Sequence, residues 1–132
     1  MPDIKADTFT IAGKEYNSRL LVGTGKYKDM EETSAAIAES GAEIVTVALR
    51  RVDVENPDDS MLSHIDREKY LLLPNTSGAR DAEEAVRLAR LARASGLPAW
   101  IKLEVTPDPR YLLPDPVETL KAAEILVGDG FT

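Results

Sequence analysis

The stretch Tyr70-Leu-Leu-Leu-Pro-Asn-Thr-Ser-Gly-Ala-Arg-Asp-Ala-Glu-Glu-Ala-Val-Arg-Leu-Ala-Arg-Leu-Ala-Arg-Ala-Ser-Gly96 holds one complete strand and helix unit. Its first residues, Tyr70–Leu73, form a short apolar run that predicts a buried strand, and Pro74 is expected to stop it. Asp81 can cap a helix that Ser95-Gly96 ends, because glycine adopts the left-handed conformation of a helix end. The apolar side chains of this helix recur at helical spacing and predict one buried stripe: Ala82, Ala85, Val86, Leu88, Ala89 and Ala92, with Arg87, Arg90 and Arg93 facing outward.

The same unit repeats along the chain. Asp29 can begin a helix that Ser40-Gly41 ends, and Asp115-Pro116 can begin another that ends at Gly128-Asp-Gly130. Asp58 to Ile65 predicts a short helix. Strands are expected to start about every 25 to 32 residues, near Arg19, Glu43, Tyr70 and Ala99, with Phe131 as the first residue of a fifth. Before the first unit, Phe9–Ile11 and Lys14–Tyr16 flank Ala12-Gly13, a pattern typical of a small hairpin.

Strands alternating with helices predict parallel strands joined by right-handed crossovers. An open doubly wound sheet and a (β/α)8 TIM barrel both fit this pattern. The barrel is favoured because Gly23-Thr-Gly25 lacks the third glycine of a dinucleotide fingerprint, and because the loops after the strands are the more polar ones. We expect an α/β chain that supplies about the first four βα units of a TIM barrel, with 1–132 as the N-terminal half of that single domain.

Composition excludes several classes of function. The chain has 132 residues, 43% of them apolar, with 23 acidic and 16 scattered basic side chains, so no cationic stripe is available for nucleic acid. There is no cysteine, and His64 is the one histidine, which leaves no metal site of the usual spacing. No apolar run is long enough for a membrane span. We expect a cytoplasmic protein without a metal or cofactor.

The segment Trp100-Ile-Lys-Leu-Glu-Val105 carries the strongest candidate for chemistry. Alternate side chains of a strand share a face, so Lys102 and Glu104 are expected to point together into a buried layer, opposite Ile101, Leu103 and Val105. Burying two charges is costly unless they pair or react. Lys102 could attack a carbonyl to form an imine while Glu104 moves protons, or the two could form an ion pair that only positions the strand.

Two other loops hold candidate binding residues. Asn75, Thr76 and Ser77 follow a strand and could contact a substrate, or they could simply form a turn that leads into the helix. Arg50-Arg51 could hold an anion or lie in solvent. Asn75, Thr76 and Arg50 are the candidate substrate contacts.

Several long motifs of the chain, taken together, resemble the thiazole synthase (ThiG) family of thiamine biosynthesis. The resemblance covers nearly the whole chain from Phe9 onward, in the expected order. The motifs are Ser18-Arg-Leu-Leu-Val-Gly-Thr-Gly-Lys-Tyr27, Leu71-Leu-Leu-Pro-Asn-Thr-Ser-Gly78, Glu83-Glu-Ala-Val-Arg-Leu-Ala-Arg-Leu-Ala92, Ile101-Lys-Leu-Glu104 and Leu112-Leu-Pro-Asp-Pro-Val-Glu-Thr-Leu-Lys121.

The resemblance implies a TIM-barrel enzyme that makes the thiazole phosphate of thiamine. Its substrates would be 1-deoxy-D-xylulose 5-phosphate, dehydroglycine from a partner enzyme, and sulfur from a thiocarboxylated sulfur-carrier protein. Lys102 would form the Schiff base with the ketose phosphate, and Glu104 would be an acid and base. The family's chain is about twice as long, so the resemblance implies that the phosphate-binding residues lie beyond Thr132 and that this chain alone is inactive. We also expect a homo-oligomer.

Two alternatives remain open from the sequence. A Schiff-base aldolase could use the same lysine on the same scaffold. A non-catalytic half barrel could instead assemble with a partner, because four strands leave open edges and an uncovered face.

Overall fold

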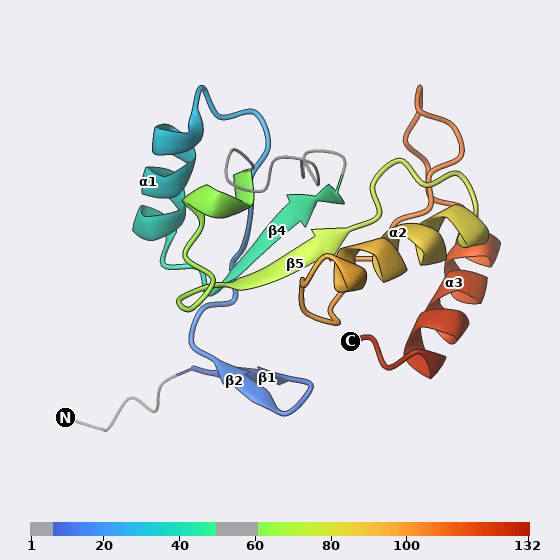
Figure 1. Cartoon of the computed structure of the whole chain (residues 1–132), viewed down its shortest axis with the longest axis horizontal. Helices are drawn as coiled ribbons and strands as arrows, with labels where there is room; N and C mark the ends of the chain where they lie inside the picture. The colour runs from blue at the N-terminus through green and yellow to red at the C-terminus, as the bar shows by residue number, and fades with distance from the viewer. Residues whose placement is uncertain (1–6, 50–60) are drawn as a thin grey trace.

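The computed structural model describes residues 7–49 and 61–132. It is an α/β structure with a parallel sheet of order β3-β4-β5 and a separate two-stranded hairpin, β1-β2. In Figure 1, β4 and β5 run through the middle, with α1 to one side and α2 and α3 to the other, while the hairpin lies near the amino-terminal ends of the strands. The predicted class of fold, α/β with parallel strands, is confirmed.

The hairpin forms where the sequence predicts it. Strands β1 (Phe9–Ile11) and β2 (Lys14–Tyr16) pair antiparallel. Ala12 and Gly13 have φ angles of 50° and 77°, the left-handed geometry that a tight two-residue hairpin turn requires. The ring of Tyr16 lies 5.7 Å from that of Phe9 and 6.4 Å from that of Trp100, centroid to centroid. The hairpin therefore packs against Trp100 through the ring of Tyr16.

The three parallel strands are β3 (Leu21–Gly23), β4 (Ile44–Ala48) and β5 (Leu71–Asn75). Residues paired across parallel strands point to the same side, so the register divides the sheet into two faces. On the helix face, side chains of β4 and β5 pack with α1, α2 and the turn between β4 and β5: Ile37, Val45, Val47, Met61, Ile65, Leu72, Ala92 and Leu97. On the opposite side, the hairpin face, Ile44 and Leu73 are buried with Tyr16 of the hairpin.

One expectation for the first parallel strand is wrong. The sequence predicts a buried strand over Arg19–Val22, but β3 begins at Leu21 and its Leu21 side chain is 41% exposed. Among the described residues β3 pairs only with β4, so its other edge is unpaired in this part of the chain.

Proline does not stop β5, contrary to the sequence prediction. The strand runs through Pro74 to Asn75. Leu71 donates its N–H to Glu43 on the β4 side, whereas Thr76 donates to Lys102 on the other side. Because donors alternate along a strand, the N–H that proline lacks would have pointed toward the segment after α2, so pairing with β4 is undisturbed.

That missing donor also explains a second correction. Residues 99–105 are predicted to form a strand, but the structure assigns there only an isolated parallel bridge between Asn75 and Lys102. Lys102 N donates to Pro74 O at 2.8 Å, and Lys102 O accepts from Thr76 N at 3.2 Å. The preceding hydrogen bond of a parallel ladder would need the backbone N–H of residue 74, which proline lacks. The segment is extended beside β5 without a regular ladder. Thr132 in turn exchanges hydrogen bonds with Ala99 and Ile101, the parallel pattern expected of a fifth strand that starts near Phe131.

The three helices begin and end at the predicted signals. Helix α1 spans Met30–Ser40, α2 spans Ala82–Ala94 and α3 spans Pro116–Gly128. The carboxylates of their N-cap residues accept backbone N–H bonds from the first turns, which satisfies donors that a helix leaves free; these caps are Asp29, Asp81 and Asp115. Of the predicted short helix at 58–65, residues 58–60 lie outside the described part, and Met61–His64 is a 3-10 turn, η2.

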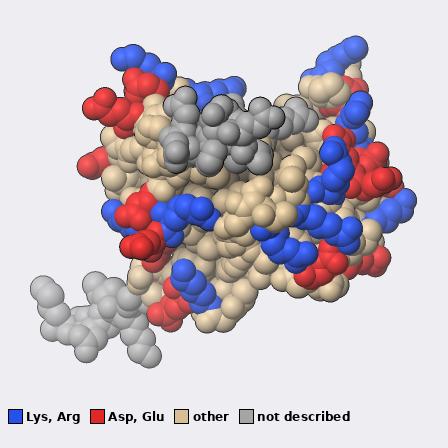
Figure 2. Space-filling model, viewed as in Figure 1, with Lys and Arg blue, Asp and Glu red and all other residues tan. Residues whose placement is uncertain are grey.

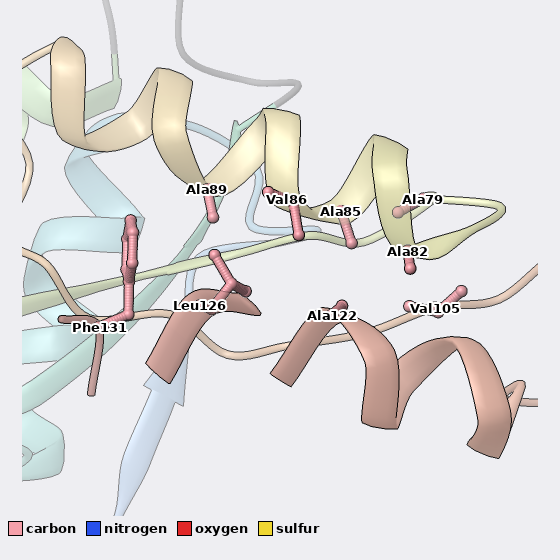
Figure 3. Close-up of a cluster of buried hydrophobic side chains, with 9 residues drawn as sticks. All are labelled: Ala79, Ala82, Ala85, Val86, Ala89, Val105, Ala122, Leu126 and Phe131. Carbon is pink, nitrogen blue, oxygen red and sulfur yellow. The ribbon is translucent and has the colours of Figure 1, made fainter. Parts of the chain in front are cut away.

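Small side chains let α2 and α3 approach closely. Figure 3 shows a row of alanines on α2 facing Ala122 and Leu126 of α3, with Val105 and Phe131 at its two ends. The predicted stripe of α2 is buried except for Leu88, which is only partly covered, and Arg87, Arg90 and Arg93 are exposed as expected. Arg90 binds the carboxylate of Asp129 at 2.7 Å, which ties α2 to the end of α3.

The surface carries charges of both signs. In Figure 2, lysines and arginines are interspersed with aspartates and glutamates at both sides of the visible face, around a less charged centre. In the part of the chain that the structure describes, none of the helices has the length and apolar character to cross a bilayer.

Candidate functional site

A polar row occupies the hairpin face where the strands end. We use this term for Thr46 of β4, Asn75 of β5, and Lys102 and Glu104 of the neighbouring extended segment. The pairings Ala48 with Asn75 and Asn75 with Lys102 place these side chains on one side of the sheet. The hairpin packs on the other end of this face, so the polar row lies at its carboxyl-terminal end.

The predicted pairing of Lys102 and Glu104 is present. Lys102 Nζ donates to Glu104 Oε1 at 2.7 Å. Ile101, Leu103 and Val105 point the other way and pack against the core cluster of α2 and α3, as the alternation predicts. The spacing of two residues therefore does place an amine and a carboxylate in direct contact.

The burial predicted for this pair is wrong for the chain as described. The side chain of Lys102 is 46% exposed and that of Glu104 is 30% exposed. The helix face of their segment is covered by α2 and α3, but in the described residues the hairpin and the neighbouring strands cover only the amino-terminal part of the opposite face. In the part of the chain that the structure describes, the amine is therefore partly exposed.

Asn75 joins the polar row to β4. It is buried, its amide nitrogen lies 3.2 Å from the hydroxyl of Thr46, and its side-chain oxygen accepts the N–H of Ser77 at 3.1 Å. Sequence reasoning did not select Thr46. The available signal was its position in the run Ile44–Ala48, where a lone hydroxyl shares the face of Ile44.

Thr76 binds the backbone of the candidate acid and base. Its side chain is 0% exposed, and its hydroxyl donates to Glu104 O and accepts from Glu104 N, both at 2.8 Å. The contact with substrate that the sequence suggests for Thr76 stays a prediction. The third predicted contact, Arg50, lies outside the described residues.

A cavity of about 390 Å³ lies between the loops that follow β5 and Val105. Its walls include Leu112, whose φ of 54° is unusual for a residue other than glycine. Lys102 and Glu104 are not among its lining residues, which are Ser77, Gly78, Arg80, Glu84, Thr106, Pro109 and Leu112. The cavity is thus adjacent in sequence to the polar row but separate from the amine.

No cluster of three or more metal-binding side chains occurs within residues 7–49 and 61–132. His64 lies on η2, where its ring nitrogen is 3.1 Å from the Ser63 hydroxyl. The chemistry that the described site offers is that of a paired primary amine and carboxylate beside hydroxyl and amide groups.

Comparison with known proteins identifies the family. The model of the thiazole biosynthesis protein ThiG matches residues 10–132. The chain belongs to the ThiG family. Thiazole synthase 2 of Syntrophotalea carbinolica is 70% identical over 125 residues, and thiazole synthase of Syntrophobacter fumaroxidans is 71% identical over 121 residues. The resemblance drawn from the motifs is thereby confirmed.

The matches also define how much of a family member is present. The alignments cover 95% and 92% of this chain but 48% and 47% of the two relatives, so the chain spans about half the length of the curated relatives it matches. Among solved structures, a chain of the Amycolatopsis orientalis BexX/CysO complex is similar, with a TM-score of 0.72 and 29% identity over 92% of this chain and 50% of that one.

Proposed function

We propose that this ThiG-family chain is the N-terminal half of a (β/α)8 barrel and that the whole protein is a thiazole synthase. Residues 1–132 would form part of one domain and supply about four βα units. The family match and the coverage of about half of each relative support this proposal. Strands β3, β4 and β5, the segment bridged at Lys102, and Thr132 lie side by side in chain order, and each pairs in parallel with the next. Successive parallel neighbours of this kind are the arrangement of a TIM barrel.

The observation that carries the proposed chemistry is the contact between Lys102 Nζ and Glu104 Oε1 at 2.7 Å. Only a neutral amine attacks a ketone, and Glu104 is placed to take the proton that Lys102 must lose. Attack forms a carbinolamine. Glu104 can then return a proton to the departing hydroxyl, so that amine and ketone become an imine and water.

The imine makes the neighbouring carbon of the sugar more acidic. A carboxylate beside it can then accept that carbon's proton and deliver it elsewhere as the ketone migrates along the sugar. Glu104 lies on the same side as the amine and within hydrogen-bond distance of it, so the same carboxylate can serve this second transfer. One pair of residues thus serves both steps.

The proposed reactants are 1-deoxy-D-xylulose 5-phosphate, dehydroglycine from a partner enzyme, and sulfur from a thiocarboxylated sulfur-carrier protein. The similarity to a chain of the BexX/CysO complex supports the docking of a partner protein on this fold. Asn75 and Arg50 are proposed substrate contacts, and the phosphate is proposed to bind in the other half of the barrel. We further propose a cytoplasmic homo-oligomer and no activity for the 132-residue chain alone.

Trapping the imine tests the proposal. The full-length protein that carries this sequence is mixed with the ketose phosphate and reduced with borohydride, and its peptides are analysed by mass spectrometry. We expect the mass of the reduced sugar on the peptide containing Lys102, and its loss in Lys102→Arg, because a guanidinium does not form the imine.

Lys121→Arg is the matched control. Lys121 also pairs with a carboxylate, that of Glu118 at 2.6 Å, but both residues belong to α3 and not to the polar row. This variant should be labelled like the wild type. A label on any other lysine would overturn the assignment, and turnover of the sugar without a sulfur donor would favour the aldolase alternative.

A further inference from the structure

In the loop after β5, the side-chain hydroxyl of Thr76 accepts a hydrogen bond that a backbone carbonyl would accept in a regular parallel ladder. Lys102 N donates to Pro74 O, and Thr76 N donates to Lys102 O, so a regular parallel ladder would continue with Glu104 N donating to Thr76 O. That carbonyl accepts Ala79 N at 3.0 Å instead, because the chain turns away toward α2. Glu104 N donates to the hydroxyl of Thr76.

The same hydroxyl also satisfies the other polar group of the Glu104 backbone. Thr76 Oγ1 donates to Glu104 O at 2.8 Å, the same distance at which it accepts from Glu104 N. A hydroxyl has one donor and can accept as well, so both capacities are used within one residue. The side chain is fully buried, which excludes competition from solvent.

We propose that Thr76 is a positioning residue for the reaction, one that sets where Glu104 stands relative to Lys102. This inference rests on the proposed function of the Lys102 and Glu104 pair. Through its N–H, Thr76 holds the backbone of Lys102, and through its hydroxyl it holds the backbone of Glu104. One residue of the adjacent loop therefore fixes both ends of the proton path, and it acts through Glu104 rather than on the substrate.

Substitution separates this role from a contact with substrate. Thr76→Val keeps the shape but removes the hydroxyl, whereas Thr76→Ser keeps the hydroxyl. In the full-length protein, we expect Thr76→Val to lower the rate of imine trapping at saturating ketose phosphate about 10- to 100-fold, the usual effect of a small misplacement of a reacting group. The half-saturating concentration should change less than about twofold, and Thr76→Ser should restore the rate to within about threefold.

Thr33→Val controls for general destabilisation. Thr33 is also buried, and its hydroxyl donates to a backbone carbonyl, Asp29 O at 2.8 Å, but it lies on α1 away from the polar row. Its variant should trap the imine at the wild-type rate. The proposal is overturned if Thr76→Val raises the half-saturating concentration at an unchanged maximal rate, or if a folded Thr76→Ser loses more than tenfold.

Crystal structures of the two Thr76 variants test the geometry without relying on any reaction. We expect the 2.7 Å contact between Lys102 Nζ and Glu104 Oε1 to be kept in Thr76→Ser and lost in Thr76→Val. If the contact survives in Thr76→Val, the positioning role fails whatever the enzyme makes. If the wild type traps no sugar at Lys102 but the contact follows the hydroxyl as expected, the proposed function fails and the structural link stands.

Discussion

Leu126 of α3 provides a stability test of the α2–α3 core. Its side chain is 2% exposed and packs in the cluster of small residues between the two helices (Figure 3). Leu126→Ala removes three carbons, worth roughly 2.4 kcal/mol of transfer free energy at about 0.8 kcal/mol for each carbon. The cavity left behind adds to this, since the alanines around it cannot extend to fill it, and brings the expected cost to about 3–5 kcal/mol.

Leu120→Ala is the matched control on the same helix. Leu120 is 62% exposed, so the identical substitution should cost less than about 1 kcal/mol. Urea unfolding of the 132-residue chain, followed by far-ultraviolet circular dichroism, gives both free energies of unfolding. If the two variants differ by less than about 1 kcal/mol, Leu126 does not occupy the core position that the structure assigns to it.

Three further predictions concern the framework of the fold. Ser18 N and Asn17 N donate to the Glu43 carboxylate and lower its pKa, so the stability that Glu43 contributes is present above the ordinary pKa of 4.5 and is lost as pH falls through the lower folded-state pKa. The stability difference between wild type and Glu43→Gln should therefore shrink between pH 7 and pH 3 in urea titrations; an unchanged difference would contradict the role of its charge. Asp81→Ala should cost about 0.5–2 kcal/mol in the same unfolding assay, because Glu84 N loses its cap, while Asp81→Asn should cost less. Gly41 ends α1 at a φ of 67° with open space around it, so Gly41→Ala should lower the thermal midpoint through backbone strain of roughly 1 kcal/mol, and an unchanged midpoint would refute this.

Features set by neighbouring residues were predictable from the sequence. The hairpin turn at Ala12-Gly13, the aspartate caps and the glycine after α1 all lie where the sequence places them. A cap or a tight turn depends on the backbone geometry of a few consecutive residues, and those residues are visible in the sequence. The alternation that brings Lys102 and Glu104 together is equally local.

Features that depend on distant partners were not predictable. Proline was expected to end β5, but whether a missing N–H matters depends on which neighbour that N–H would have faced. The exposure of Lys102 likewise depends on what covers the hairpin face, which alternation along one segment does not specify.

The sequence by itself determined the order of the strands and helices, the ends of the three helices, and the identity of the paired amine and carboxylate. The tertiary structure decided how that pair is held, because the hydroxyl of Thr76 reaches the backbone of Glu104 across 28 residues of chain. Local signals report the conformation of the residues that carry them. A hydrogen bond between two loops depends on the packing of β5, α2 and the bridged segment together, and only the folded chain brings these elements side by side.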